Sequence, residues 1–318
     1  MGKPDTVTKE YVSRTDIFAD IFNQYLYGGR QVISPKNLKE RDSTEITLPF
    51  GNGSDGYVQR YRDVIKIFKI MEDDNAIYVL LGTELQMNIN YAMPVKDMLY
   101  NAIDYSSQIT ATNRKRWRNR GEHVTGDEFL SGFSKRDKLI PVITLTIYFG
   151  SRKWDGPTSL HQMFDKSCSS LFQFIPDYKI NLITPEGLSE EDLDNYRTEF
   201  RNVMKFIKYS GDKDALLKMV NSDDSFKSVS RETANVINVV TKSGFKIDEK
   251  EEVVDMCKAV MDIREEGREE GREEGREEGQ LITLVNLAEK KVITIEQAAE
   301  EAGMTVNEFL EKMTVKLS

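Results

Sequence analysis

The sequence predicts an α/β fold followed by an all-helical C-terminal extension, and three observations predict it. Two runs rich in β-branched and aromatic residues, 63–68 and 76–81, follow one another across a short acidic turn. A longer apolar run at 139–149 has the length and composition of a central buried strand. Beyond Pro185 the apolar residues recur at helical spacing.

The bulk composition is that of a soluble protein without a membrane segment. Of the 318 residues, 39% are hydrophobic and 31% are charged, and no apolar run approaches the roughly 18 residues of a membrane span. The start of the chain lacks the apolar core of a signal peptide. Cys168 and Cys257 make no disulfide framework, and the isolated His123 and His161 make no zinc site. We therefore expect a cytoplasmic protein with no membrane contact.

The acidic charge is concentrated near the C-terminus. The net charge is −9. Residues 264–279 contribute −4 and residues 280–318 contribute −2, which leaves about −3 for the body of the chain. A nearly neutral body with a local basic patch is compatible with a DNA enzyme, although the total charge argues against simple coating of nucleic acid.

The N-terminal part predicts one helix and a long connector. Apolar residues at helical spacing predict a helix over 15–27, with Thr15 as its N-cap and Gly28 at its end. Asp16 and Asp20 share one face of this helix. On composition alone Asp16 is a partner of the helix dipole and Asp20 a solvated surface charge. Residues 30–56 are a connector that contains a short edge strand at 45–50 and a loop at 51–56.

Asp63 and Glu84 are the main candidates for chemistry. Asp63 opens the first strand of the predicted pair, and the second strand continues into Glu84-Leu85-Gln86. Side chains two apart on a strand share a face, so Glu84 and Gln86 point the same way. If the strands form a hairpin, Asp63 comes near Glu84, and two neighbouring carboxylates favour a hard cation such as Mg²⁺ or Mn²⁺. The alternative is surface charge at strand ends.

A basic cluster follows the next predicted helix, which covers 95–107. Arg114, Lys115, Arg116, Arg118 and Arg120 surround Trp117 within seven residues. Cations neutralise phosphates and an aromatic side chain stacks on a base, so we expect these six residues to contact DNA. The alternative is that they are cations favourably placed at a helix C-terminus, which accounts for one or two of them.

The second half of the chain is expected to be mostly helical. After the strand at 139–149 come a helix over 160–174 and a short strand at 179–183. Helices are then predicted over 189–209, 212–220, 230–241 and 248–263. The four Arg-Glu-Glu-Gly repeats of 264–279 predict a marginal helix or an extended linker, since each interior glycine costs about 1 kcal/mol against alanine.

Two amphipathic helices are predicted within 281–318. They resemble a helix-turn-helix, but Glu308 and Glu311 on the second helix would repel phosphates. We therefore expect a protein-contact module through which the chain forms homo-oligomers. The predicted domains are 1–185 for the core, 186–263 for a helical extension, 264–280 for a linker and 281–318 for the small helical module.

The ordered set of motifs resembles the PD-(D/E)XK nuclease superfamily, and within it the Rpn family of bacterial recombination-promoting nucleases and transposases. The resembling segments span residues 11–280: Asp16–Phe22, Arg62-Asp63, Glu84-Leu85-Gln86, Leu139–Ile143, Ile147–Gly150 with Trp154, and the Arg-Glu-Glu-Gly tract. The resemblance implies a mixed central sheet flanked by helices and a DNA endonuclease linked to recombination or mobile elements.

The resemblance also implies a set of site residues. Asp63 and Glu84 would hold Mg²⁺ (or Mn²⁺) together with the backbone carbonyl of Leu85, and Gln86 would position the attacking water. Asp16, with Asp20 as the reserve, would lean toward the metal. The superfamily usually has lysine where Gln86 stands, and this departure puts turnover in doubt. The alternative function is a catalytically degenerate nuclease fold that binds DNA or protein.

Overall fold

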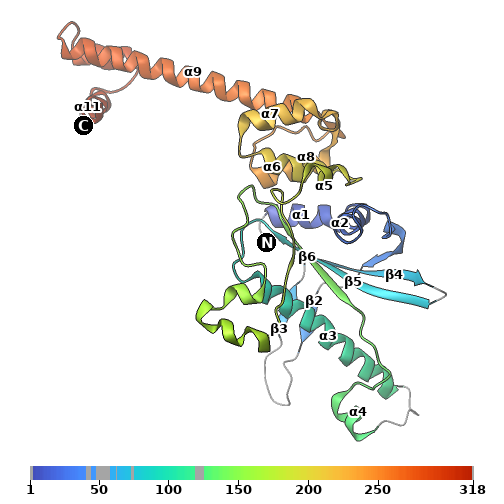
Figure 1. Ribbon diagram of the computed structural model, residues 1–318. Helices are drawn as coiled ribbons and strands as arrows, with labels where there is room; N and C mark the ends of the chain where they lie inside the picture. The colour runs from blue at the N-terminus through green and yellow to red at the C-terminus, as the bar shows by residue number, and fades with distance from the viewer. Residues whose placement is uncertain are drawn as a thin grey trace. The chain divides into compact units, whose positions relative to one another are not determined.

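The protein consists of two compact units, 1–257 and 258–318. The computed structural model describes residues 3–40, 44–47, 58–61, 63–72, 75–118 and 125–316. The first unit combines a five-stranded sheet with helices, and the second is helical (Figure 1). The α/β class with a helical C-terminal region is therefore confirmed. The expected boundary at residue 185 does not separate compact units, because the helices that follow it belong to the first unit.

The main sheet is mixed, with the strand order β1-β4-β5-β6-β7. β1, β4 and β5 are antiparallel neighbours, whereas β5, β6 and β7 run parallel. Its strands are β1 Leu38–Glu40, β4 Val64–Glu72, β5 Asn75–Gln86, β6 Val142–Tyr148 and β7 Asn181–Ile183. The long apolar run thus gives its strand from Val142 onward, one residue beyond Pro141, which cannot donate to the ladder.

Two small sheets lie outside the main one. β2 Thr44–Thr47 pairs with β3 Val58–Tyr61, and β8 Val229–Ser230 pairs with β9 Val253–Val254. The strand expected at 45–50 therefore belongs to a separate ribbon and not to the edge of the main sheet. Residues 48–50 and the predicted loop at 51–56 lie outside the described residues.

Helices cover both faces of the main sheet. On one face, the Lys66 side chain of β4 lies over the Phe18 ring of α2 (Thr15–Tyr27). On the other face, α3 (Met93–Arg118) packs on β6, where Thr146 donates a hydrogen bond to Asp97. The remaining helices of the first unit are α1 Lys3–Ser13, α4 Gly126–Ser131, α5 Glu190–Asp194, α6 Phe200–Tyr209, α7 Lys213–Ser222 and α8 Arg231–Thr241, with 3₁₀ turns η1 Pro35–Asn37, η2 Leu160–Met163, η3 Lys166–Phe174 and η4 Asp224–Lys227.

The first helix, α1, was not among the sequence predictions. Its β-branched residues lower helix propensity, but Pro4 and Asp5 in its first turn are typical of a helix start. It buries Tyr11 and Val12, and it contacts α8 as well as β4 and β5. The predicted N-cap of the next helix is wrong by one residue, since the N-cap is Arg14. The predicted end at Gly28 is confirmed, with φ of +58° in the left-handed region.

Two expected helices take other forms. The segment 160–174 forms the 3₁₀ turns η2 and η3, because the Asp165 side chain accepts the Ser167 N–H and starts a new turn. The helix expected over 189–209 is divided into α5 and α6, and the segment between them is bonded to Asp20 of α2.

The second unit is built around the end of one long helix. α9 (Met256–Glu289) contains all four Arg-Glu-Glu-Gly repeats, so the tract is helical and not an extended linker. Its C-terminal part packs with α10 (Ile295–Glu301) and α11 (Val306–Lys316) around Val285, Ala288, Ala298, Ala299 and Phe309. Of the two amphipathic helices predicted for this region, the first is the end of α9, and the segment that follows it forms two helices, α10 and α11.

Candidate functional site: two carboxylates and a lysine at the end of β5

The strand pairing brings Asp63 and Glu84 to the same end of the sheet. β4 and β5 are antiparallel with Val64 opposite Thr83, so Asp63, one residue before β4, stands at the level of Glu84. The Asp63 side chain is fixed there, because its Oδ2 accepts the Leu85 N–H at 2.8 Å. The antiparallel pairing of these two strands, which the sequence analysis stated as a condition, is present in the structure.

Glu84 is buried and forms an ion pair with a lysine. Its side chain is 1% exposed, and its Oε2 lies 2.8 Å from Nζ of Lys96, which belongs to the first turn of α3 and is 30% exposed. A carboxylate removed from water needs a compensating cation. In this structure that cation is Lys96, a residue that the sequence analysis did not single out.

The two charged groups beside Glu84 have shifted pKa values. Burial raises the pKa of Asp63, and this outweighs the lowering effects of the Leu85 N–H, Lys96 and Lys9. Burial alone would lower the pKa of Lys96, but the charge of Glu84 and its hydrogen bond outweigh it, so this pKa is raised. Lys96 is therefore a full cation at neutral pH, while Asp63 holds its proton more tightly than an exposed carboxyl.

Gln86 lies at the site but is turned onto its own strand. Its Nε2 donates a hydrogen bond to the carbonyl oxygen of Leu85 at 3.0 Å. That carbonyl is the oxygen expected to join Asp63 and Glu84 around a metal. A carbonyl oxygen has two lone pairs, so the Gln86 amide occupies one of the two acceptor positions of this oxygen.

Asp16, which the resemblance implies near the metal, is bound to a neighbouring arginine. Its carboxylate pairs with Arg14 at 2.6 Å, and Arg14 also pairs with Glu232 of α8 at 2.5 Å. Arg14 and Asp16 are 38% and 48% exposed, so this is a surface ion pair at the start of α2. The charged groups outside the sheet that act on Asp63 come from α1 and α3: Lys9, Asp5 and Lys96.

Asp20 is also different from its expected role as a solvated surface charge. It is 3% exposed, and its Oδ2 accepts hydrogen bonds from the Arg197 and Thr198 N–H groups and from the Thr198 hydroxyl. Asp20 therefore ties α2 to the segment between α5 and α6. Its buried role is structural.

A buried polar seam fixes α3 on the sheet. Thr146 donates to Asp97 Oδ2 at 2.9 Å, and Thr144 donates to Asn101 Oδ1 at 2.7 Å. Thr146 is also the residue opposite Glu84 in the β5–β6 pairing. Since Asp97 directly follows Lys96, the seam sets the position of the Lys96 backbone above Glu84. Two features of the sequence could have indicated this seam: two threonines that alternate with apolar residues in the strand, and two polar residues four positions apart on the helix.

The predicted basic cluster lies at the other end of α3. At a rise of 1.5 Å per residue, Arg114 is about 27 Å along the helix from Lys96. Arg114 and Lys115 are exposed, whereas Arg116 pairs with Asp137. The side chains of Trp117 and Arg118, and all of Arg120, lie outside the described residues. The cluster is therefore remote from the two strand carboxylates.

The residues present provide the oxygen donors that a hard cation needs. Across the described ranges, no group of three His, Cys, Asp or Glu side chains forms a metal centre. Mg²⁺, however, commonly binds through one or two carboxylates and keeps several waters. Asp63, Glu84 and the Leu85 carbonyl make such a minimal donor set, so the chemistry of these residues fits the metal implied by the resemblance.

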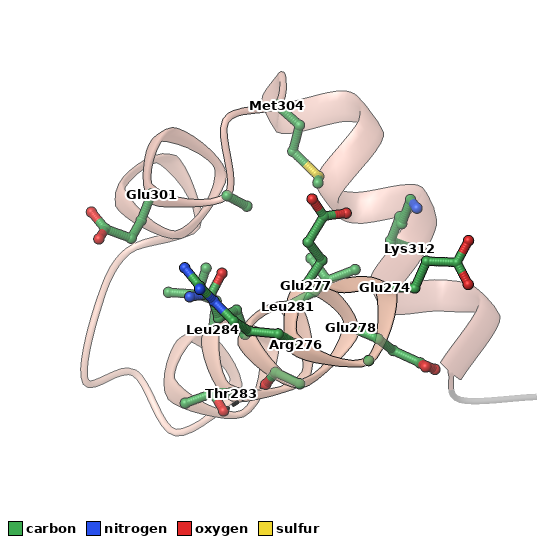
Figure 2. Close-up of a pocket in the computed structure, with 14 residues that line it drawn as sticks. Glu274, Arg276, Glu277, Glu278, Leu281, Thr283, Leu284, Glu301, Met304 and Lys312 are labelled. Carbon is green, nitrogen blue, oxygen red and sulfur yellow. Dashed lines mark hydrogen bonds between the residues drawn. The ribbon is translucent and has the colours of Figure 1, made fainter. Parts of the chain in front are cut away.

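A wide cleft lies elsewhere, in the second unit. It measures about 1100 Å³ and lies between the end of α9 and the pair α10 and α11. Figure 2 shows Met304 and Glu277 pointing toward one another across it. Four glutamates and two cations line this cleft, so its net negative charge does not favour a phosphate. These charged residues are Glu274, Glu277, Glu278, Glu301, Arg276 and Lys312.

Comparisons with known proteins do not identify a family for this chain. No protein-family model, no curated protein and no solved structure matches the chain significantly. Within the described residues, no helix is long and apolar enough to cross a membrane.

Proposed function

We propose that this protein is a metal-dependent DNA endonuclease of the PD-(D/E)XK type. The observation that carries the proposal is the Asp63–Glu84 pair at the end of β4 and β5, with Asp63 bonded to the Leu85 backbone and Lys96 bonded to Glu84. The site lies where the parallel strands β5 and β6 end, which is where α/β sheets commonly bind ligands. The link to recombination or mobile elements rests on the sequence resemblance alone.

Each residue of the site has a defined task in this proposal. Asp63 and Glu84 would hold Mg²⁺, or Mn²⁺ in its place, together with the Leu85 carbonyl. A metal held there would supply a water of lowered pKa and would polarise the phosphoryl oxygen. The raised pKa of Asp63 means that metal binding competes with a proton, so cleavage should increase from acid to neutral pH.

Nicking of supercoiled plasmid tests the proposal. The wild-type protein should convert supercoiled plasmid to open circles in Mg²⁺, and EDTA should stop the reaction. Asp63→Ala should remain inactive at the same protein concentration. Equal nicking by wild type and Asp63→Ala would mean that the activity comes from a contaminant or from another site.

The second candidate is a catalytically degenerate fold that binds DNA or protein. Two observations favour it: Gln86 carries no charge where the superfamily has lysine, and Lys96 already neutralises Glu84. This candidate predicts DNA binding without metal binding and without cleavage, which a metal titration distinguishes from the first.

The exposed end of α3 gives a prediction about DNA affinity. Arg114→Ala with Lys115→Ala should weaken binding to any DNA sequence and should reduce the slope of log K against log salt by about 2, because each phosphate contact contributes about 0.9. Fluorescence anisotropy on a labelled duplex from 50 to 200 mM salt measures it. The control is the double variant Lys213→Ala with Lys218→Ala on α7, which removes the same charge at another place. An equal loss of DNA affinity in this control would mean that the effect comes from net charge and not from the end of α3.

A further inference from the structure

The cation beside Glu84 comes from a helix and not from the strand that carries the carboxylates. Lys96 Nζ is 2.8 Å from Glu84 Oε2, and its charge also acts on Asp63. It is 30% exposed, whereas Glu84 is 1% exposed. Glu84 itself is therefore shielded from solvent, and its partner Lys96 is the charged group of the pair that solvent can reach.

The position of Lys96 is not one that helix energetics alone would select. α3 starts at Met93, so Lys96 lies in its first turn, where the helix dipole favours acidic residues and disfavours cations. The ammonium is held there by Glu84 and by the Tyr100 ring, whose centroid is 5.7 Å away. The Asp97–Thr146 and Asn101–Thr144 bonds prevent α3 from sliding along the sheet.

The formal charges at the site favour a phosphodiester only when Lys96 is counted. Asp63 and Glu84 contribute two negative charges and Lys96 one positive charge. A divalent cation brings the balance to one positive charge, which a single phosphodiester anion neutralises. Without Lys96 the same site would be neutral before the substrate enters.

We propose that Lys96 is a catalytic residue whose ammonium group donates a hydrogen bond to a non-bridging oxygen of the scissile phosphate while remaining close to Glu84. This inference rests on the proposed nuclease function. An ammonium has three donors, so Lys96 can keep Glu84 and bind the phosphate together. Its charge then stabilises the additional negative charge of the transition state in a partly water-excluded site.

The reaction consumes one water and leaves Lys96 unchanged. The water oxygen bonds to phosphorus and releases a proton to solvent, and the P–O bond to the leaving sugar oxygen breaks. That oxygen takes a proton from solvent, which gives a phosphate monoester and a hydroxyl end. Lys96 keeps its own protons throughout and supplies charge and orientation.

Single-turnover cleavage of a duplex at saturating Mg²⁺ tests the inference with four proteins. Lys96→Met should cleave about 10²–10³-fold more slowly than wild type, with DNA affinity in Ca²⁺ changed by less than about threefold. Lys96→Arg should keep part of the rate, since it keeps the charge. Lys96→Met combined with Gln86→Lys should recover at least about tenfold, because Gln86 is two residues from Glu84 on the same face of β5.

The outcomes separate this inference from the proposed function. If wild type cleaves and Asp63→Ala does not, but Lys96→Met cleaves at the wild-type rate, the role of Lys96 is disproved and the nuclease function stands. If wild type does not cleave at all, both fall. Circular dichroism melts establish whether each variant is folded. If Lys96→Met is unfolded, the Lys96→Met, Gln86→Lys protein replaces it in the test, because the new lysine restores a cation near Glu84. Its cleavage rate is then compared with that of Lys96→Arg. A combined variant that folds but cleaves no faster than Asp63→Ala contradicts the inference.

Discussion

Asp63→Asn is expected to lower the rate of plasmid cleavage by about 10²-fold or more while leaving the protein at least as stable as wild type. Under the proposed function the rate falls because the amide replaces a carboxylate that would bind the metal. Metal catalysis contributes several kcal/mol, and about 1.4 kcal/mol corresponds to a tenfold change in rate. The amide is nearly the same size, and its carbonyl oxygen still accepts the Leu85 N–H. A residue selected for packing would show the opposite pattern, with stability lost first.

The stability half of this prediction follows from the pKa of Asp63. Burial raises that pKa, so the folded protein binds the proton more tightly than the unfolded chain. The free energy of folding that comes from this tighter proton binding is fully present below about pH 3.9, the pKa of an aspartate carboxyl in the unfolded chain. It is lost as the pH rises through the pKa of Asp63 in the folded protein. At neutral pH the ionised Asp63 therefore opposes folding, and asparagine removes that penalty.

Thermal melts in EDTA between pH 4 and pH 8 measure the effect. The melting temperature of Asp63→Asn relative to wild type should increase with pH, where about 1 kcal/mol corresponds to about 2–4 °C in a domain of 150–250 residues. Asp127→Asn, at an exposed carboxyl of α4, is the control and should show no such trend. An Asp63→Asn protein that melts lower than wild type at pH 8 would contradict the assignment.

Asp20→Ala is expected to destabilise the first unit by about 3 kcal/mol. The substitution leaves the Arg197 and Thr198 N–H groups without their acceptor, and each buried donor left unpaired costs about 1–3 kcal/mol. Asp16→Ala removes a surface ion pair and should cost less than about 1 kcal/mol. Urea unfolding followed by tryptophan fluorescence measures both.

The two aspartates make a matched pair, because they lie one turn apart on α2. Equal losses of stability for Asp16→Ala and Asp20→Ala would contradict the separation of surface and buried roles. A loss of cleavage by Asp16→Ala without a loss of stability would return Asp16 to the catalytic site that the sequence resemblance suggested.

The part of the site that the sequence predicts is the part encoded locally. Asp63 and Glu84 could be found because each stands at the end of a β-rich run, and the alternation of a strand fixes which residues share a face. The helical region that follows the sheet is predicted by apolar periodicity, whereas the mixed sheet is implied by the family resemblance. These patterns span a few residues and need no tertiary contact.

Lys96 could not be predicted in the same way. Its approach to Glu84 depends on the rotation of α3 about its axis, which is set by contacts between Asp97, Asn101 and two threonines of β6. Such contacts join residues more than 40 positions apart in the sequence. The buried role of Asp20 could not be predicted for the same reason, since its partners lie 177 and 178 positions away.

The Arg-Glu-Glu-Gly tract shows how the flanking helical segments override local propensity. Four glycines argue against a helix when the tract is considered alone. In the structure the tract continues a helix that starts at Met256 and ends in the packed core of the second unit. Helix nucleation is then provided by the flanking segments, and the tract only has to propagate it.

Isothermal titration of the metal-free protein with Mg²⁺ tests the central claim most directly, because the claim is that Asp63 and Glu84 form one divalent-cation site. We predict one binding event per chain in the wild type, absent in Glu84→Gln and in Asp63→Asn, and weaker at pH 5 than at pH 8. Identical binding heats in wild type and Glu84→Gln would contradict the account and leave Lys96 as a structural partner of a buried carboxylate.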